Sequence, residues 1–381
     1  MSPAPARAIE PRTRAWTRTA AVDFFRGLGL WMVFVDHMDP NIWSYLTLWR
    51  FGFSDFAEIF VFLSGFIGIG SYQRALDAGQ TGAVVKKLFR RVRRLYFAHI
   101  LSLALSLMVV AIFAQRGLRL NDGSLYVWMQ DPVRYAVRAL TLTYTPPAFS
   151  LLPLYIAISP VLLLAAIGLR RAPVLTFSIS GAFWLVSQFP AIDSRLTVPT
   201  WYLHPAAWQF LFVLGAATRY YSDRLRQFAL SRAVVVAAAA MVAVSVALKA
   251  LTVHWMAARL PAILHGIPAL DVGKDHLAFY RLLHFLALAT LAHAWLRWKR
   301  PPLQSWIPRL AIACGWDSLF IYCSILVLDV GANLVLAFTH GGALMQTQLT
   351  IYGLALLCGM AWLRRGNSRS EPSAIRFQHA V

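Results

Sequence analysis

The sequence predicts an all-α fold, a polytopic membrane protein built as a bundle of about ten transmembrane helices. Three observations lead to this fold class. Hydrophobic residues make up 59% of the 381 residues and charged residues only 14%, which is too apolar for an ordinary soluble domain. The apolar residues form runs of about 17–25, the length that crosses a bilayer. The basic residues gather in short clusters between these runs.

Ten segments are long and apolar enough to span the membrane. In chain order they are 21–39, 55–73, 93–114, 149–169, 173–190, 204–221, 232–253, 277–297, 316–338 and 343–363. The fourth has the least defined start, because Pro146 and Pro147 break an apolar stretch that suits a surface helix. The predicted domains are a basic cytoplasmic tail at 1–20, a transmembrane domain at 21–365 and a cytoplasmic tail at 366–381.

The positions of lysine and arginine predict the orientation. With the N-terminus in the cytoplasm, the inner segments hold 25 of these residues and the outer loops hold 8. Cytoplasmic loops carry the excess of positive charge in membrane proteins, so we expect both termini inside. The net charge of +20 then reflects topology, and nucleic acid is not an expected partner.

Ionisable residues in the first two predicted spans mark the candidate functional site. Such residues are costly inside a bilayer and are retained where they meet a partner or line a wet cavity. Asp23, Arg26, Asp36 and His37 lie in the first span, and Glu58 opens the second. Arg26 and His37 are eleven positions apart, so they share one helix face and differ by roughly 16 Å in depth.

An acid/base pair is expected at the outer end of this face. Glu58 enters the membrane at the level of His37, and a carboxylate with an imidazole at one depth can form such a pair. Asp36 lies about 100° away from His37 on the helix, which favours Glu58 as the closer partner. The plainer alternative is a hydrogen-bonded structural histidine near the membrane interface.

Arg281 is a further charge within a predicted span, three residues before His284. It can meet a substrate carboxylate or pair with Asp329, and the sequence leaves both open. The basic cluster at 86–94 serves as a cytoplasmic anchor or, alternatively, binds an anionic cofactor, since guanidinium groups hold phosphate through a planar fork of donors.

No metal site is expected. Asp36, His37 and Asp39 do not place three ligands on one helix face. The cysteines have no paired spacing outside the membrane, so we expect packing roles for Cys314, Cys323 and Cys358.

Several stretches carry a resemblance to a known family. DFFRGLGLWMVFVDH at 23–37, followed by FGFSDFAEIFVFLSGF at 51–66, resembles the opening of the OpgC family, the succinyltransferases of osmoregulated periplasmic glucans. The spacing of Arg26 and His37 is similar to that of the wider acyltransferase-3 group. Later stretches also resemble the family: RRVRRLY at 90–96, LLPLYIAISP at 151–160, PAAWQFLFVLG at 205–215, RLLHFLALA at 281–289 and GWDSLFIYC at 315–323.

The resemblance implies a membrane-bound O-acyltransferase of the bacterial inner membrane. Its co-substrate would be a cytoplasmic acyl-CoA, succinyl-CoA above others, with no other bound cofactor, and its acceptor a periplasmic glucan. Its partners are then the bilayer, this donor and this acceptor. His37 would act as base or nucleophile, oriented by Glu58 or Asp36. The remaining site residues would hold the donor or the substrates: Arg26, Arg91 and Arg94 for the donor, and Arg281, His284 and Tyr155 for the substrates.

The sequence departs from the family pattern in two places. His204 and Pro205 stand where Asn-Pro is frequent, and the loop at 254–276 has no recognisable motif. Two other functions remain open. Ten spans with buried charge also suit a transporter or exporter of a glycan or a small anion, and a catalytically silent membrane scaffold is the third possibility.

Overall fold

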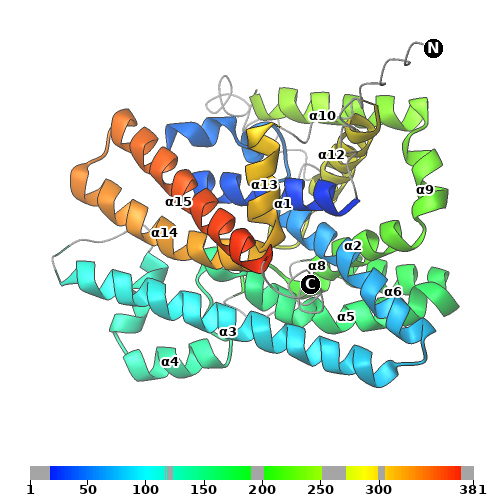
Figure 1. The fold of residues 1–381 in the computed structure, drawn as a ribbon, viewed down its shortest axis with the longest axis horizontal. Helices are drawn as coiled ribbons and strands as arrows, with labels where there is room; N and C mark the ends of the chain where they lie inside the picture. The colour runs from blue at the N-terminus through cyan, green and yellow to red at the C-terminus, as the bar shows by residue number, and fades with distance from the viewer. Residues whose placement is uncertain are drawn as a thin grey trace, which may run out of the picture.

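All secondary structure in the described part of the chain is helical. The computed structural model describes residues 18–115, 117, 123–189, 201–250, 272–298 and 305–369, and it contains no strand there. The all-α prediction is therefore confirmed (Figure 1). The helices in chain order are α1 (Arg18–His37), α2 (Phe56–Asp77), α3 (Thr81–Ala114), α4 (Pro132–Leu140), α5 (Leu151–Arg171), α6 (Pro173–Val186), α8 (Pro205–Tyr220), α9 (Ser222–Ala229), α10 (Arg232–Ala250), α12 (Phe279–Trp298), α13 (Trp306–Trp316), α14 (Ser318–Thr339) and α15 (Ala343–Arg369).

Short 3₁₀ helices occupy the connections. They are η1 (Ile42–Leu46), η2 (Leu48–Arg50), η3 (Gly123–Leu125), η4 (Val127–Met129) and η5 (Pro147–Phe149). The first two belong to the segment that joins α1 to α2. The predicted tails at 1–20 and 366–381 fall mainly outside the described residues, and so does most of the loop at 254–276.

Seven helices of the described chain are long and apolar enough to cross a membrane: α2, α3, α5 together with η5, α10, α12, α14 and α15. The chain is thus a polytopic membrane protein, but the predicted count of ten spans is not confirmed. The three remaining predicted spans also form helices. Among them, α6 has 14 residues, α8 has 16, and α1 carries charged residues at Asp23, Arg26 and Asp36.

Two helix crossings are close enough to require glycine. A Cβ added at Gly27 on α1 would lie 1.8 Å from the Ala311 carbonyl oxygen on α13, and one added at Gly315 would lie 1.8 Å from the Asp23 carbonyl oxygen. Small residues allow backbones of membrane helices to approach in this way. Helix α13 lies outside the ten predicted spans, yet it crosses directly over α1 (Figure 1).

The second crossing joins α2 and α8. A Cβ added at Gly65 would lie 2.0 Å from the Phe212 carbonyl oxygen, and one added at Gly215 would lie 2.0 Å from the Phe62 carbonyl oxygen. Gly65 and Gly215 thus allow the backbones of α2 and α8 to touch. Trp208 and Phe212 of α8 are completely buried at this crossing, so α2 is held firmly between α8 and α1.

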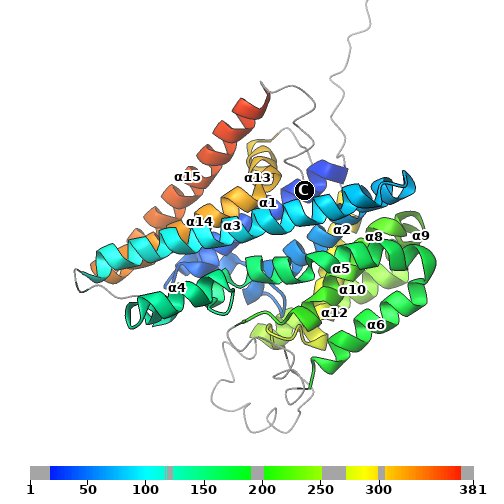
Figure 2. The ribbon, with the colours of Figure 1, turned by 90° about the horizontal axis from the view of Figure 1, so that it is seen from below.

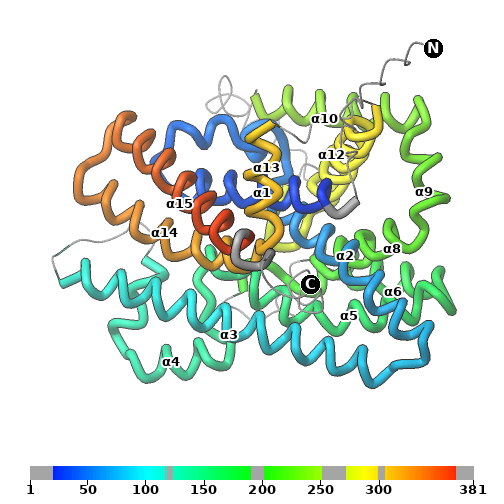
Figure 3. Tube along the Cα trace, in the orientation of Figure 1, coloured from blue at the N-terminus to red at the C-terminus, as the bar shows by residue number. Residues whose placement is uncertain are grey.

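The long α3, with 34 residues, runs across the lower part of the molecule in Figure 1 and across the middle of the view in Figure 2. It packs against α5 and α14, whereas α10 and α12 pack against each other at the opposite edge (Figures 1 and 3). Helix α1 contacts α2, α13 and α14. The segment with the candidate residues is consequently inside the bundle and surrounded by helices from both halves of the chain.

Candidate active site

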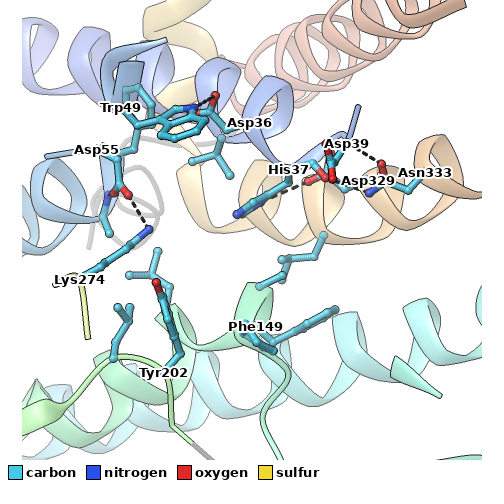
Figure 4. A pocket seen from close by; sticks show the side chains of 18 of the residues that line it. Asp36, His37, Asp39, Trp49, Asp55, Phe149, Tyr202, Lys274, Asp329 and Asn333 are labelled. Atoms are coloured by element: carbon cyan, nitrogen blue, oxygen red, sulfur yellow. Dashed lines mark hydrogen bonds and ion pairs between the residues drawn. The ribbon is translucent and has the colours of Figure 1, made fainter. Parts of the chain in front are cut away.

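A cavity of about 1110 Å³ lies beside the C-terminal end of α1. Its wall includes residues of α1, α2 and α14, the segment between α1 and α2, and Tyr202 and Lys274 from more distant parts of the chain (Figure 4). Charged groups, aromatic rings and aliphatic side chains all contribute to this wall. The volume is slightly above the range for small-molecule pockets, about 300–1,000 Å³.

His37 is the last residue of α1 and lines the cavity. Its Nδ1 lies 3.5 Å from Oδ2 of Asp329 on α14, and its side chain is 37% exposed while that of Asp329 is 7% exposed. A carboxylate beside Nδ1 favours a proton on that nitrogen and leaves the Nε2 lone pair available as a base. The separation is longer than a good hydrogen bond, as catalytic pairs often are before substrate binds.

Asn333, four residues beyond Asp329 on the same helix, holds the backbone at the end of α1. Its Nδ2 donates to the His37 carbonyl at 2.9 Å, and its Oδ1 accepts from the Asp39 N–H at 2.8 Å (Figure 4). The last carbonyls of a helix have no partner within the helix. One face of α14 therefore fixes both the imidazole and the backbone that carries it.

Asp36 is turned away from His37. Its Oδ1 accepts a hydrogen bond from Thr47 Oγ1 at 2.5 Å and another from Trp49 Nε1 at 3.1 Å. Both donors belong to the segment between α1 and α2. Asp36 therefore fastens this segment to α1, and the expectation that it orients the imidazole is wrong.

Glu58 is also engaged elsewhere. It is completely buried, its Oε2 accepts the backbone N–H of Asp55 at 2.9 Å, and its Oε1 accepts from Arg281 Nε. The first of these bonds completes a capping box at the start of α2, which satisfies N–H groups that a helix start leaves free. The expected pairing of Glu58 with His37 is therefore wrong, and Asp329 takes that position.

Arg281 connects α12 to the start of α2. Besides Glu58, it pairs with Asp55 Oδ2 at 2.9 Å, and Lys274 Nζ lies 2.6 Å from the same oxygen. Pairing of Arg281 with Asp329, one of the two open alternatives, does not occur. Arg281, Lys274 and Asp55 all line the cavity, so this cluster presents ion-paired, hydrogen-bonding groups to its interior.

The carboxyl of Asp55 stays charged in this cluster. Burial alone would raise its pKa, but the charges of Lys274 and Arg281 outweigh burial and hold the pKa well below its usual range. A carboxyl with a lowered pKa stabilises the fold above its ordinary pKa, and this contribution is lost as the pH falls through the folded-state value. The ion pairs that Asp55 makes with Lys274 and Arg281 are therefore intact at neutral pH.

His284 lies behind the cavity wall. It is 1% exposed, and its Nδ1 accepts the backbone N–H of Ser54 at 3.3 Å and lies 2.5 Å from Ser54 Oγ. Gly52 packs on its ring, where an added Cβ would lie 2.3 Å from Nε2. This position supports the segment before α2, and His284 is not among the residues that line the cavity.

A smaller pocket of about 100 Å³ lies further along α1, toward its N-terminal end. Arg91 of α3 is fixed beside it, because NH2 donates to Ser64 Oγ at 2.7 Å and Nε donates to Ser159 Oγ at 3.2 Å. Its wall contains four residues that the sequence analysis singled out: Arg26, Arg91, Arg94 and Tyr155. Three helices, α1, α3 and α5, thus bring these side chains together.

Asp317 lies at the edge of the smaller pocket and pairs with two arginines. Its Oδ1 lies 3.6 Å from Arg94 NH2, and its Oδ2 lies 2.8 Å from Arg364 Nε. Counted with Arg26 and Arg91, positive groups outnumber the negative ones around this pocket. An anionic ligand matches that imbalance.

The two cavities adjoin each other. Phe60, Leu151 and Tyr322 line both of them. On α1, Arg26 lines the smaller pocket and His37 lines the larger cavity. The helix face that the spacing of these two residues predicts therefore extends from one cavity to the other.

A comparison with family models gives a match to the family described as OpgC protein, over residues 18–369. The chain belongs to the OpgC family. This membership indicates an acyltransferase-like function in a membrane protein. A search of curated proteins found no match, and a search of solved structures found none either.

In this OpgC-family chain, sequence reasoning missed the roles of Asp329, Asn333 and Lys274. The sequence indicated that Asp329 has some role, because a carboxylate inside an apolar span needs a partner, but it did not indicate which partner. Asn333 and Lys274 carried no comparable signal. No group of three or more His, Cys, Asp or Glu side chains in the described residues is placed to hold a metal.

The cysteines of the OpgC-family chain are free thiols. Cys314 is buried, and its Sγ lies 4.0 Å from Sγ of Cys358. Cys323 lies against the Ala98 carbonyl of α3. All three are in helix contacts within the bundle.

Proposed function

We propose that this protein is an O-acyltransferase of the bacterial inner membrane that moves a succinyl group from cytoplasmic succinyl-CoA to a hydroxyl of a periplasmic glucan. One observation carries the proposal. His37, paired with the buried Asp329, lines a large cavity that adjoins an arginine-lined pocket on the same face of α1. A base that two substrates approach from opposite sides suits transfer across a membrane.

The proposed reaction uses His37 as general base. Nε2 takes the proton of the acceptor hydroxyl, whose oxygen attacks the carbonyl carbon of the thioester. The new C–O bond forms as the C–S bond breaks, and the imidazolium returns its proton to the departing sulfur. Asp329 stabilises the imidazolium while it exists. In the alternative role of His37, Nε2 holds the acyl group covalently before the sugar arrives.

The donor would approach from the arginine side. Its phosphates are anionic and suit the guanidinium groups near the smaller pocket, Arg94 and Arg26 among them. The pocket of about 100 Å³ is far too small for a whole coenzyme, so it would hold the slender thioester end. Arg94 would then exchange its Asp317 partner for a phosphate group.

The acceptor would occupy the larger cavity. Trp49, Phe149 and Tyr202 line it, and flat aromatic faces match the C–H side of a pyranose ring. Lys274 and Arg281 supply donors for hydroxyl oxygens or for the carboxylate of a succinyl group. A volume of about 1110 Å³ accommodates several sugar units.

Mass spectrometry of periplasmic glucans tests this proposal. Cells that carry the protein should yield glucans heavier by succinyl units than cells that lack it. The variant His37→Ala should lower acylation by a factor on the order of 10²–10⁴, the usual contribution of a general base. Unchanged acylation by a correctly inserted His37→Ala protein would remove the catalytic assignment.

Two adjoining cavities along one helix also suit transport, which is the second candidate function. A transporter moves its substrate without covalent change. If glucans reached the periplasm only in the presence of the protein and their masses stayed the same, transport would replace acyl transfer as the function. An acyl-imidazole trapped by rapid acid quenching would select the covalent role of His37 over the general-base role.

A further inference from the structure

Three side chains separate the two cavities. Phe60 of α2, Leu151 of α5 and Tyr322 of α14 line both the cavity at His37 and the pocket at Arg26. All three are buried. They form a shared wall between the proposed donor side and the proposed acceptor side.

Each of the three helices continues this arrangement one turn further in. Ser64 follows Phe60 by four residues, Tyr155 follows Leu151 by four, and Ser318 precedes Tyr322 by four. Ser64, Tyr155 and Ser318 all line the smaller pocket only. The spacing of four places each pair on one face of its helix. The shared wall therefore lies at one level of the bundle, between the base and the arginines.

Contacts behind these side chains restrict their movement. The Tyr322 hydroxyl donates a hydrogen bond to the Ala148 carbonyl at 3.1 Å, which fixes the angle of its ring. The ring of Phe60 lies against Gly29 of α1, where an added Cβ would lie 3.1 Å from Cζ. The opening between the three side chains is consequently determined by their own size.

We propose that Phe60, Leu151 and Tyr322 form the constriction through which the acyl group reaches His37, and that they select the acyl group by its width. The inference rests on the proposed acyl transfer and adds a determinant of specificity to it. A constriction between two wider spaces limits the cross-section of what passes and not its length. Straight acyl chains should therefore be accepted and branched ones rejected.

Succinyl-CoA and methylmalonyl-CoA are matched probes for this selection. Their acyl groups are isomers with the same atoms and the same charge, and they differ in whether the carbon chain is branched. Interactions with a charged residue at either end are available to both. The carboxylate of the methylmalonyl group is one carbon closer to the thioester, so width is measured by the change in the ratio of the two kcat/KM values when Phe60 alone is replaced.

The experiment measures CoA release with the purified protein in lipid nanodiscs, with glucan from cells that lack the protein as acceptor. Phe60→Leu should raise the ratio of kcat/KM for methylmalonyl-CoA to that for succinyl-CoA on the order of tenfold, the usual weight of one or two methylene groups in a pocket. Phe60→Trp should lower the same ratio. The change in the ratio should come from the kcat/KM value for methylmalonyl-CoA, the branched donor.

Phe62→Leu is the matched control. Phe62 is buried on the same helix and packs edge-on against Phe285 at 5.3 Å between ring centres, but it lines neither cavity. Its replacement should leave the ratio unchanged. A shift in Phe62→Leu equal to that in Phe60→Leu would attribute the effect to general loosening and overturn the inference.

Failure of this inference is distinct from failure of the proposed function. A wild-type protein that transfers succinyl to the glucan, with a ratio that does not move in either Phe60 variant, contradicts the constriction alone. A wild-type protein that transfers neither group contradicts succinyl transfer itself and removes the basis of the inference.

Discussion

At the scale of single residues, the geometry around His37 is built from α14. The imidazole is at a helix end, where side chains have more freedom than in the middle of a helix and where carbonyls need outside partners. Asp329 contacts the ring at 3.5 Å, and Asn333 binds the carbonyl of the same residue at 2.9 Å. The base is thus positioned by two side chains of one helix, separated by four residues.

Replacement of Asp329 tests whether the carboxylate assists the base. Asp329→Asn keeps the size of the side chain but removes the charge that stabilises the imidazolium. We expect kcat to fall on the order of 10²–10⁴, while KM for the acyl donor stays close to that of the wild type. Steady-state kinetics of CoA release separates the two constants.

Asp39→Asn serves as the control for this variant. Asp39 is exposed beside the same cavity, and its hydrogen bond to Asn333 uses the backbone N–H, which the substitution leaves in place. This protein should retain most of the activity. An equal loss of activity in both variants would show that the negative charge of the cavity matters as a whole and that the contact of Asp329 with His37 does not.

At the scale of helices, pairs of glycines determine how closely the elements around the site approach. Helix α2 carries Phe60 and Glu58 to the cavity region, and its depth in the bundle depends on the crossing with α8 at Gly65 and Gly215. Each glycine faces a backbone carbonyl of the other helix. A side chain at either position cannot be accommodated by rotation of a flexible neighbour.

Gly65→Ala should therefore separate α2 from α8 and destabilise the protein. Overpacking in a tight contact costs about 1–3 kcal/mol, and sometimes more. We expect a lower melting temperature of the detergent-solubilised protein, measured by a thermal-shift assay.

Gly359→Ala is the matched helical control. Gly359 is on the exposed side of α15, and an added Cβ there meets nothing within 4 Å. Alanine at this position should leave stability the same or raise it by about 0.5–1 kcal/mol, because glycine costs backbone entropy in a helix. If the Gly65→Ala protein were as stable as the Gly359→Ala protein, α2 and α8 would be able to move apart at little cost in free energy.

At the scale of the whole molecule, the two cavities of the candidate site lie one after the other along α1. The larger cavity is at the end of α1 that carries His37, and the arginine-lined pocket is toward the opposite end. The basic residues of the last turn of α2 and of the first half of α3, which are Arg74 and the cluster at 86–94, are on the arginine side. The positive-inside rule then predicts that the cavity at His37 faces the periplasm.

Cysteine labelling in intact cells tests this orientation. In a background with Cys314→Ser, Cys323→Ser and Cys358→Ser, we expect Leu46→Cys to react with a membrane-impermeant maleimide, because Leu46 is 64% exposed in the segment after α1. Gln80→Cys, at the exposed turn before α3, should react only after permeabilisation. The reverse pattern would place the proposed donor side in the periplasm.

The sequence by itself determined the features that depend on local composition and helix periodicity. The length and polarity of the apolar runs determine that the protein is all-α and membrane-spanning, and the spacing of Arg26 and His37 determines their shared face of α1. The stretches at 23–37 and 51–66 also indicated the OpgC family, which the match over residues 18–369 establishes. These properties need no knowledge of which helices are neighbours.

Only the tertiary structure decided which partner each charge meets. His37 meets Asp329, which is separated from it by most of the chain, while Glu58 meets Arg281 instead. Sequence spacing determines the face on which a side chain lies within its own helix, but the neighbour of that face is selected by helix packing. The unpredicted α13 and the glycine crossings at Gly27 and Gly65 set that packing through direct backbone contact, which hydrophobic periodicity does not encode.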